Sequence, residues 1–400
     1  MATVVPQNYT YLDWAATAPL CEEAAEAMRP YLLPGRANLD LGMNANSLHS
    51  PGRAAFEAME LARKQIAADL GVSRPGEIVF TSGATEADNA ALAGIAYAEA
   101  QRRRRSNGKD FVPRIVTTSI EHDAVLKPAR KLASEGFEVV YIDPDRRGFV
   151  QPEALEKALT DSTVLVSLQM ANSEVGSIQP IAELARLAHG QGSLLHTDAT
   201  QALGKIPINL VELGADAVSL SAHKIGGPKG IGLLYLKART PFSPQMLGGG
   251  QEGGKRSTTQ NVCGIAGFAA ALHAVAGLVE EESARQRELR DWLYERLSAI
   301  DGVRMTVPVA PGDTDYLPNI VHMLVHGYES ETLVLRLDMA GFGVSGGSAC
   351  ASHSLEPSHV LRALGVSSDD AFGALRISFG RDTSRDDLER FARAFEECIG

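Results

Sequence analysis

Two apolar runs of the chain each lead to a side chain that could take part in catalysis. One run leads into Ser221, His223 and Lys224, so that a single amine lies among hydroxyl and imidazole groups. The other run is followed directly by Asp198. An amine and a carboxylate at two strand ends suit pyridoxal phosphate, because the lysine can hold the aldehyde as a Schiff base while the carboxylate keeps the ring nitrogen protonated. Taken alone, the pair could also be two solvated strand ends.

The segment Phe80–Glu86 has the pattern of a strand that passes into a helix, and it could bind the phosphate of such a cofactor. Free N–H groups of the first helical turn, near Ala84, and the Thr85 hydroxyl would meet an anion at the positive end of the helix. Thr85 could instead be an N-cap whose capping box is completed by Asp88, and the two interpretations are compatible. The hydroxyl and imidazole that flank the lysine could supply further phosphate donors.

A second reactive group lies near the C-terminus, in the glycine- and serine-rich stretch Val344–Ser354. Such small residues do not build a packed strand, so we expect a loop whose thiol, Cys350, can move. The other cysteines, Cys21, Cys263 and Cys398, are expected to be small buried hydrophobes. The four are far apart and form no CxxC pair, so we expect free thiols, with neither a zinc site nor a disulfide framework.

Length and composition are those of a large globular protein. A chain of 400 residues exceeds the size of one hydrophobic core, which predicts a large domain and a smaller one. Charged residues make up 22% and apolar residues 44%, which excludes a disordered chain. The net charge of −11 disfavours nucleic acid as the main partner. The start, Met1–Thr10, lacks the pattern of a secretion signal, so we expect a cytoplasmic protein.

Two further stretches of the sequence could indicate a docking surface or a membrane-spanning helix. The run Arg102–Arg105 could be a docking patch, but it ends a predicted helix, where cations complement the helix dipole. The stretch Val262–Val279 is uncharged but rich in alanine and glycine, and it contains His273. We interpret it as a buried helix, with no membrane span.

Apolar runs rich in β-branched residues alternate with helical patterns, which predicts an α/β fold with a largely parallel sheet. Ligands then bind at the carboxyl ends of the strands. We expect strands at 77–81, 114–118, 138–142, 163–168, 193–197, 216–220 and 232–236, and helices at 54–70, 86–102, 124–134 and 181–189. A large domain over 15–261 is expected, with 1–14 and 262–400 forming a smaller α+β domain that holds a long linking helix and the cysteine loop, at about 343–356.

Taken in order, these motifs resemble the NifS/IscS-type cysteine desulfurases, which belong to the class V branch of fold type I pyridoxal phosphate enzymes. The resemblance covers almost the whole chain. It is carried by Tyr11–Thr17, Thr81–Glu86, Glu121–His122, Asn172–Gly176, His196–Gln201, Ser221–Lys224 and Gly346–Arg362.

The resemblance implies roles for individual residues. Asp198 would pair with the pyridine nitrogen, and His122 would stack on the ring. Gln201 and Asn172 would surround the phenolic oxygen of the cofactor and the substrate. Arg376, in the run Leu375–Gly380, would bind the substrate carboxylate.

It also implies a reaction and partners. Lys224 would move a proton from Cα of L-cysteine, and the Cys350 thiolate would attack the substrate sulfur, which leaves a persulfide and L-alanine. His122 is a candidate acid or base in this step. The sulfur would pass to an acceptor protein. Thr259 matches a phosphate contact lent by a second subunit, so a homodimer is implied.

Two other functions remain open. A selenocysteine lyase or another class V enzyme would share Lys224 and Asp198 but would not require Cys350. A partner or scaffold protein could keep the fold without catalysis. The sequence does not distinguish iron–sulfur cluster assembly from tRNA thiolation as the destination of the sulfur.

Overall fold

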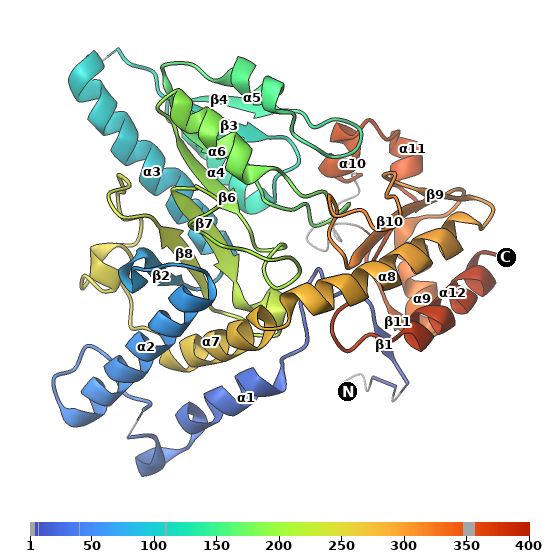
Figure 1. The fold of residues 1–400 in the computed structure, drawn as a ribbon, viewed down its shortest axis with the longest axis horizontal. Coiled ribbons are helices and arrows are strands. Elements are labelled where there is room, and N and C mark those ends of the chain that lie inside the picture. Colours follow the sequence, from blue (N-terminus) through green and yellow to red (C-terminus); the bar gives the residue numbers. More distant parts are fainter. Residues whose placement is uncertain (1–4, 7, 40, 109, 347–356) are drawn as a thin grey trace.

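A seven-stranded sheet forms the centre of the larger part of the molecule (Figure 1). The computed structural model describes residues 5–6, 8–39, 41–108, 110–346 and 357–400. The strand order is β2-β8-β7-β6-β5-β3-β4, and β8 runs antiparallel to β2 and β7 while the remaining neighbours are parallel. The predicted α/β fold is therefore confirmed. The strands are β2 Ile78–Thr81, β3 Arg114–Thr118, β4 Glu138–Ile142, β5 Thr163–Ser167, β6 Leu194–Asp198, β7 Ala217–Ser221 and β8 Gly232–Leu236.

Helices cover both faces of this sheet, which is why most of its strands are continuous apolar runs. On one face α3 (Ala84–Asn107) and α4 (Asp123–Ser134) pack against the strands through residues such as Ile95 and Val125. On the other face lie α2 (Ser50–Asp69), α5 (Pro152–Ala158) and α6 (Ile181–Gly190). The predicted helices are all present, and α5 is an additional short one.

Helix starts differ from the prediction where a local signal other than the apolar pattern sets them. Helix α2 begins four residues before the expected Ala54, because Pro51 lies in its first turn and His49 caps it by accepting a hydrogen bond from Gly52 N at 3.2 Å. Helix α3 begins at Ala84, with Gly83 as its N-cap. The apolar spacing alone does not reveal such starts.

The arginine run lies in the last turns of α3 and is used within the fold. Arg102 and Arg103 both pair with Glu99, whose side chain is buried. Arg103 also donates to the carbonyl oxygens of Asp161, at 2.8 Å, and Gly192. The expected position at a helix end is thus confirmed, and these two contacts tie α3 to the adjacent loops.

The smaller part of the molecule is an antiparallel sheet of order β12-β10-β9, with helices packed against both of its faces. The N-terminal strand joins this part, because β1 pairs in parallel with β11. Its elements are β1 Thr10–Tyr11, α8 Val279–Ser298, β9 Val303–Met305, β10 Ile320–Val325, α9 Ser330–Met339, β11 Phe342–Gly343, α10 His359–Ala363, α11 Ser368–Ala371, β12 Ala374–Ser378 and α12 Arg385–Ile399.

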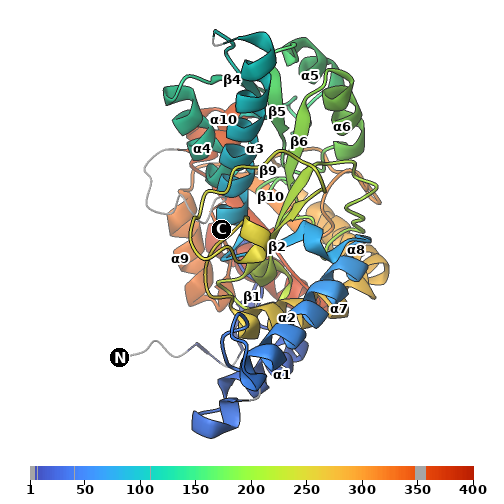
Figure 2. The same ribbon diagram turned by 90° about the vertical axis from the view of Figure 1, so that its left-hand side faces the viewer.

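The remaining elements lie beside or between these two parts. Helix α7 (Val262–Ala276) packs on both α1 (Glu22–Met28) and α2, in the region that the side view of Figure 2 shows. Short 3-10 turns are η1 Arg29–Leu32, η2 Gly35–Asn38, η3 Pro75–Glu77, η4 Ala222–Ile225 and η5 Glu252–Gly254.

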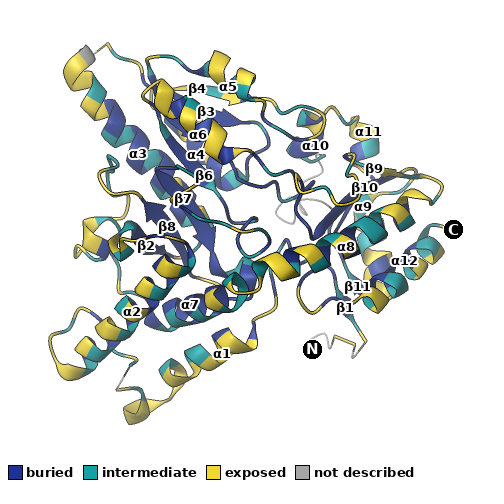
Figure 3. Ribbon diagram, viewed as in Figure 1, coloured by how far each residue is buried: buried dark blue, intermediate teal, exposed yellow. Residues whose placement is uncertain are grey.

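Helix α7 confirms the interpretation of the uncharged stretch as a buried helix. Ile265 and Phe268 are fully buried in the core of the seven-stranded part, where Figure 3 shows most of the buried residues. The chain bends by 70° between α7 and α8. Across the described ranges, no single helix has both the length and the apolar character to cross a membrane, although α7 and α8 taken as one bent pair pass that test by length and composition. The expected domain boundary before Val262 stays a prediction.

A buried ion pair ties α2 to the edge of the sheet. The Arg63 guanidinium donates to both carboxylate oxygens of Glu252, at 2.8 and 3.0 Å, and the two side chains are 7% and 1% exposed. Glu252 also accepts from the Phe80 backbone N–H at 3.0 Å, and Arg63 lies 4.5 Å above the Phe80 ring. These contacts fix β2, which leads into the start of α3.

We predict that Arg63→Met destabilises the protein by about 3–5 kcal/mol, because the substitution leaves the Glu252 carboxylate buried without its partner. Urea unfolding followed by circular dichroism measures the change. The matched control is Lys127→Met, which removes a pair with Asp123 whose side chains are 69% and 44% exposed, and it should change stability by less than about 0.5 kcal/mol. Equal effects of the two substitutions would contradict this assignment.

Candidate active site

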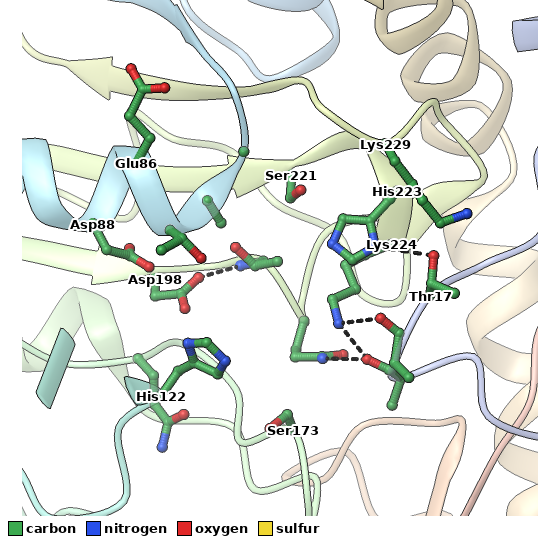
Figure 4. A pocket seen from close by; sticks show the side chains of 18 of the residues that line it. Thr17, Glu86, Asp88, His122, Ser173, Asp198, Ser221, His223, Lys224 and Lys229 are labelled. Carbon is green, nitrogen blue, oxygen red and sulfur yellow. Dashed lines mark hydrogen bonds between the residues drawn. The ribbon is translucent and has the colours of Figure 1, made fainter. Parts of the chain in front are cut away.

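A cavity of about 550 Å³ opens at the carboxyl ends of β6 and β7, beside the start of α3. Its volume lies in the range typical of small-molecule sites. Residues of seven separate segments meet there, and the close-up in Figure 4 shows how several of their side chains lie. The predicted site residues that line it are Ala84, Thr85, His122, Asp198, Gln201, Ser221, His223, Lys224 and Arg376.

The Lys224 amine is held in the cavity by the N-terminal segment. Strand β7 ends at Ser221, and the turn η4 that follows carries Lys224. Its Nζ donates to the carbonyl oxygens of Ala15 and Ala16, the latter at 2.9 Å. Gln201 donates to the same Ala15 oxygen at 2.9 Å. The amine is therefore oriented by backbone carbonyl groups of the N-terminal segment.

Asp198 and His122 lie across the cavity from this amine (Figure 4). Asp198 is the last residue of β6, and its Oδ1 accepts from the Thr200 N–H at 2.9 Å. His122 caps α4, and its Nδ1 accepts from the Ala124 N–H at 3.0 Å. A ring nitrogen that accepts carries no proton, so this contact favours the tautomer with the proton on Nε2. A flat ligand between Asp198 and Lys224 would thus have an imidazole on one side.

The start of α3, which lines the cavity, has the backbone groups that bind an anion. Its first-turn N–H groups have no acceptor within the helix, and they lie at the positive end of the helix dipole. Because Gly83 is the N-cap, Thr85 lies in the first turn, and the alternative of Thr85 as N-cap is wrong. A side chain at Gly232 would place its Cβ 2.7 Å from the Gly83 backbone, so a glycine in β8 is needed for this close approach.

His223 lines the same cavity as a neutral imidazole. Burial, helped by the positive charge of Lys224, lowers the pKa of His223 to about 4. Its Nδ1 lies 3.1 Å from the Thr17 hydroxyl. When that hydroxyl donates, Nε2–H is left to donate to an anion. The predicted role as a phosphate donor fits this arrangement.

A group of buried polar side chains beneath Asp198 was not predicted. His196 lies 2.9 Å from both the Ser167 and Ser219 hydroxyls, and burial lowers its pKa to about 3. Asp88 lies 3.6 Å from His196, and burial together with the charge of Asp198 raises its pKa well above the usual value. His196 is therefore neutral near pH 7, and the Asp88 carboxyl holds its proton more tightly than an ordinary carboxyl group. Asp88 is a polar residue on the apolar face of α3, and this position could have indicated that its side chain is buried. The interpretation of Asp88 as part of a capping box overlooked this.

Arg376 reaches the cavity from β12 in the smaller part of the molecule. It is 2% exposed, and its Nη2 donates to Asp13 at 2.7 Å while Nη1 donates to the Ser173 carbonyl at 2.8 Å. A guanidinium held in this way can bind a carboxylate by donating two parallel hydrogen bonds to its oxygens. The pairing with Asp13, far away in sequence, was not predicted.

Three predicted residues lie elsewhere. Asn172 is buried beside the cavity but does not line it, because its amide bonds the backbone of Ile120, Glu174 and Val175. Thr259 is exposed and does not line the cavity of its own chain. Cys350 lies in 347–356, outside the described residues.

Comparison with known proteins places this site in a family. The family model of the class-V aminotransferases matches residues 10–391. The chain is 41% identical to a protein of Dictyoglomus turgidum named cysteine desulfurase IscS, over 97% of this chain and 94% of that one. This chain belongs to the cysteine desulfurases of the class-V aminotransferase family. The resemblance expected from the motifs is confirmed.

Two solved structures that resemble this chain have the same fold. A NifS-like protein superimposes with a TM-score of 0.86 at 36% identity, covering 97% of this chain and 98% of that one. The structure of SspA in complex with cysteine gives a TM-score of 0.76 at 31% identity, over 93% and 99% of the two chains.

Cysteine desulfurases use pyridoxal phosphate, and the cavity has the groups that this cofactor requires. An amine, a carboxylate and a helix start face one cavity of suitable volume, and a glycine in β8 lets the helix start approach. The prediction of this cofactor is confirmed by the family. The contacts of individual residues with it stay predictions.

We predict that the stability of the apoprotein falls in acid partly because of His196. Its pKa is about 3 in the folded protein against an ordinary value of 6.5, so between these values only the unfolded chain binds the proton, and stability falls as pH falls. His196→Gln should make this fall less steep by about 1.4 kcal/mol per pH unit between about pH 4 and 5.5. Urea unfolding across this range measures the slope. His326→Gln, at an exposed position, is the control, and an equal slope in wild type and His196→Gln would contradict the prediction.

Proposed function

We propose that this cysteine desulfurase removes sulfur from L-cysteine, passes it to Cys350 as a persulfide and releases L-alanine. The convergence of Lys224, Asp198 and Arg376 on one cavity carries the proposal, because together they provide an amine, a carboxylate for a ring nitrogen and a clamp for an amino-acid carboxylate. The name of the D. turgidum relative and the complex of SspA with cysteine support this choice of substrate.

Residues on three sides of the cavity would hold the cofactor. Asp198 would bind its ring nitrogen and His122 would lie against its ring. Ala84, Thr85, Ser221 and His223 would bind its phosphate, and Gln201 would lie beside its phenolic oxygen. When bound, pyridoxal phosphate supplies an electron sink for the carbon from which a proton is removed.

Arg376 and Lys224 would act on the substrate itself. The guanidinium would bind the carboxylate, which fixes the orientation of the amino acid relative to the amine. Lys224, held by the Ala15 and Ala16 carbonyls, would then remove the proton from Cα of the substrate. The same amine would donate that proton again at a neighbouring carbon. His122, with its proton on Nε2, would be the acid for a later step.

Cys350 would be the sulfur acceptor. The other three cysteines are poor nucleophiles, because burial raises the pKa of the thiols of Cys21, Cys263 and Cys398. The Cys350 thiolate would form a bond to the substrate sulfur as the bond between that sulfur and Cβ breaks. The electron pair of the broken bond stays with the carbon skeleton, which takes up protons and leaves as L-alanine.

The later fate of the sulfur and the assembly of the enzyme are also part of the proposal. A persulfide must be passed to an acceptor protein, for iron–sulfur cluster assembly or for tRNA thiolation. Thr259, which is exposed and does not line the cavity of its own chain, would reach the phosphate in the cavity of a second copy. We propose a cytoplasmic homodimer.

We predict that Cys350→Ala retains the cofactor absorbance of the wild-type protein but loses persulfide and sulfide formation by at least about a hundredfold, because the nucleophile is missing. Sulfide release from L-cysteine and the mass of the intact protein measure the two products. Cys398→Ala is the matched control and should keep the wild-type rate. Wild-type sulfide release by Cys350→Ala would refute the assignment.

A further inference from the structure

A row of three polar side chains crosses the antiparallel sheet of the smaller part. Arg376 of β12 lies directly opposite His322 of β10, and residues in such pairs point to the same face with their Cβ atoms about 4.5–5.5 Å apart. Thr306, which follows β9, continues the row, because its N–H donates to the His322 carbonyl at 3.1 Å and its hydroxyl lies 2.7 Å from Nδ1 of His322.

Two atoms of this row need a hydrogen-bond partner. Within the described residues, Nε of Arg376 and Nε2 of His322 are both buried and make no hydrogen bond. Both residues are 2% exposed. Buried polar groups are nearly always paired, directly or through an ordered water. Their side chains leave the sheet on the same face, so one interaction can satisfy both.

The chemical state of His322 matches this pairing. Burial, and then the positive charge of Arg376, lower the pKa of His322 to about 3, so the ring is neutral. A neutral ring has one donor and one acceptor. When Nδ1–H donates to the Thr306 hydroxyl, Nε2 is the acceptor and turns its lone pair toward the guanidinium. The reverse tautomer would turn a second N–H toward a cation.

We propose that His322 is a positioning residue for the substrate clamp, accepting a water-mediated hydrogen bond from Nε–H of Arg376. This inference rests on the proposed function, in which Arg376 binds the substrate carboxylate. Nη1 is already engaged by the Ser173 carbonyl and Nη2 by Asp13. With Nε held by His322, the plane of the guanidinium is fixed from three sides.

The consequence is a fork oriented for a carboxylate. A guanidinium has five N–H donors. One each on Nη1, Nη2 and Nε is used by the contacts with Ser173, Asp13 and His322, which leaves one on each Nη. Two parallel N–H groups on neighbouring nitrogens match the two oxygens of a carboxylate. Replacing His322 should therefore weaken the binding of ligands that carry a carboxylate and leave the affinity for ligands without one unchanged.

The test compares two ligands of the holoenzyme. L-alanine carries the carboxylate, and ethylamine is the same molecule without it. Their dissociation constants are measured from the change in cofactor absorbance. We expect His322→Leu to weaken L-alanine about tenfold, the order expected for one hydrogen bond to a charged group, and to leave ethylamine unchanged. His322→Gln places an acceptor near the Nε2 position and should restore the affinity to within about twofold.

Three further variants keep the outcome interpretable. Thr306→Val removes the hydroxyl that orients the His322 ring, so it should weaken the binding of L-alanine, but less than His322→Leu does. If His322→Leu does not fold, the result with Thr306→Val decides the test. Leu324→Val, on the same strand and face, is the packing control and should affect neither ligand. Arg376→Met should lose the binding of L-alanine and keep the binding of ethylamine.

Each outcome decides one claim. If His322→Leu binds L-alanine as tightly as the wild type, or loses both ligands equally, the inference is overturned. If Arg376→Met binds L-alanine normally, the clamp itself is wrong and the proposed function loses its substrate contact. Loss of L-alanine binding in Arg376→Met with normal binding in His322→Leu overturns the inference about His322 alone.

Discussion

The carboxyl ends of β6 and β7 meet at one edge of the sheet, and every other part of the site depends on this convergence. Strand β6 ends on Asp198, and β7 leads within three residues to Lys224. Both strands lie within the sheet and are almost entirely buried, so a shift of their ends would disturb the packed core. An amine and a carboxylate are thereby held in one cavity by the packing of the sheet, with no contact between them required.

The N-terminal segment braces this site from the other part of the molecule. Within five residues, Asp13 holds Arg376, the carbonyls of Ala15 and Ala16 hold Lys224, and the Thr17 hydroxyl meets His223. The same segment continues from β1, which pairs with β11. One short stretch thus sets the position of the substrate clamp relative to the lysine. A displacement of this stretch would disturb substrate binding and the amine together.

The local pattern predicted most of the fold. Strands and helices of the large sheet came from apolar runs and helical spacing, and the parallel order followed from their alternation. The groups at strand ends, Lys224 and Asp198, were also predictable, because a polar residue that follows an apolar run marks the point where a buried strand ends. Motif resemblance added Arg376 and His122, which no spacing along the chain would connect.

The contacts that were missed join residues far apart in sequence. The Asp13 carboxylate meets Arg376 across 363 positions, and only the folded chain shows that pair. The N-cap role of Thr85 was wrong because the start of α3 is set by the approach of Gly83 to β8, a tertiary contact that local propensity does not contain. The pKa of Asp88 is raised and that of His196 is lowered chiefly by burial, which depends on packing from several elements.

The central claim is that Lys224 is the amine that holds the cofactor, and peptide mapping after borohydride reduction tests it most directly. Reduction fixes the cofactor to its lysine, and digestion followed by mass spectrometry identifies the peptide. We predict the added mass on the peptide that contains Lys224. The same mass on a peptide containing Lys205 or Lys229 in place of Lys224, or on no peptide, would contradict the claim.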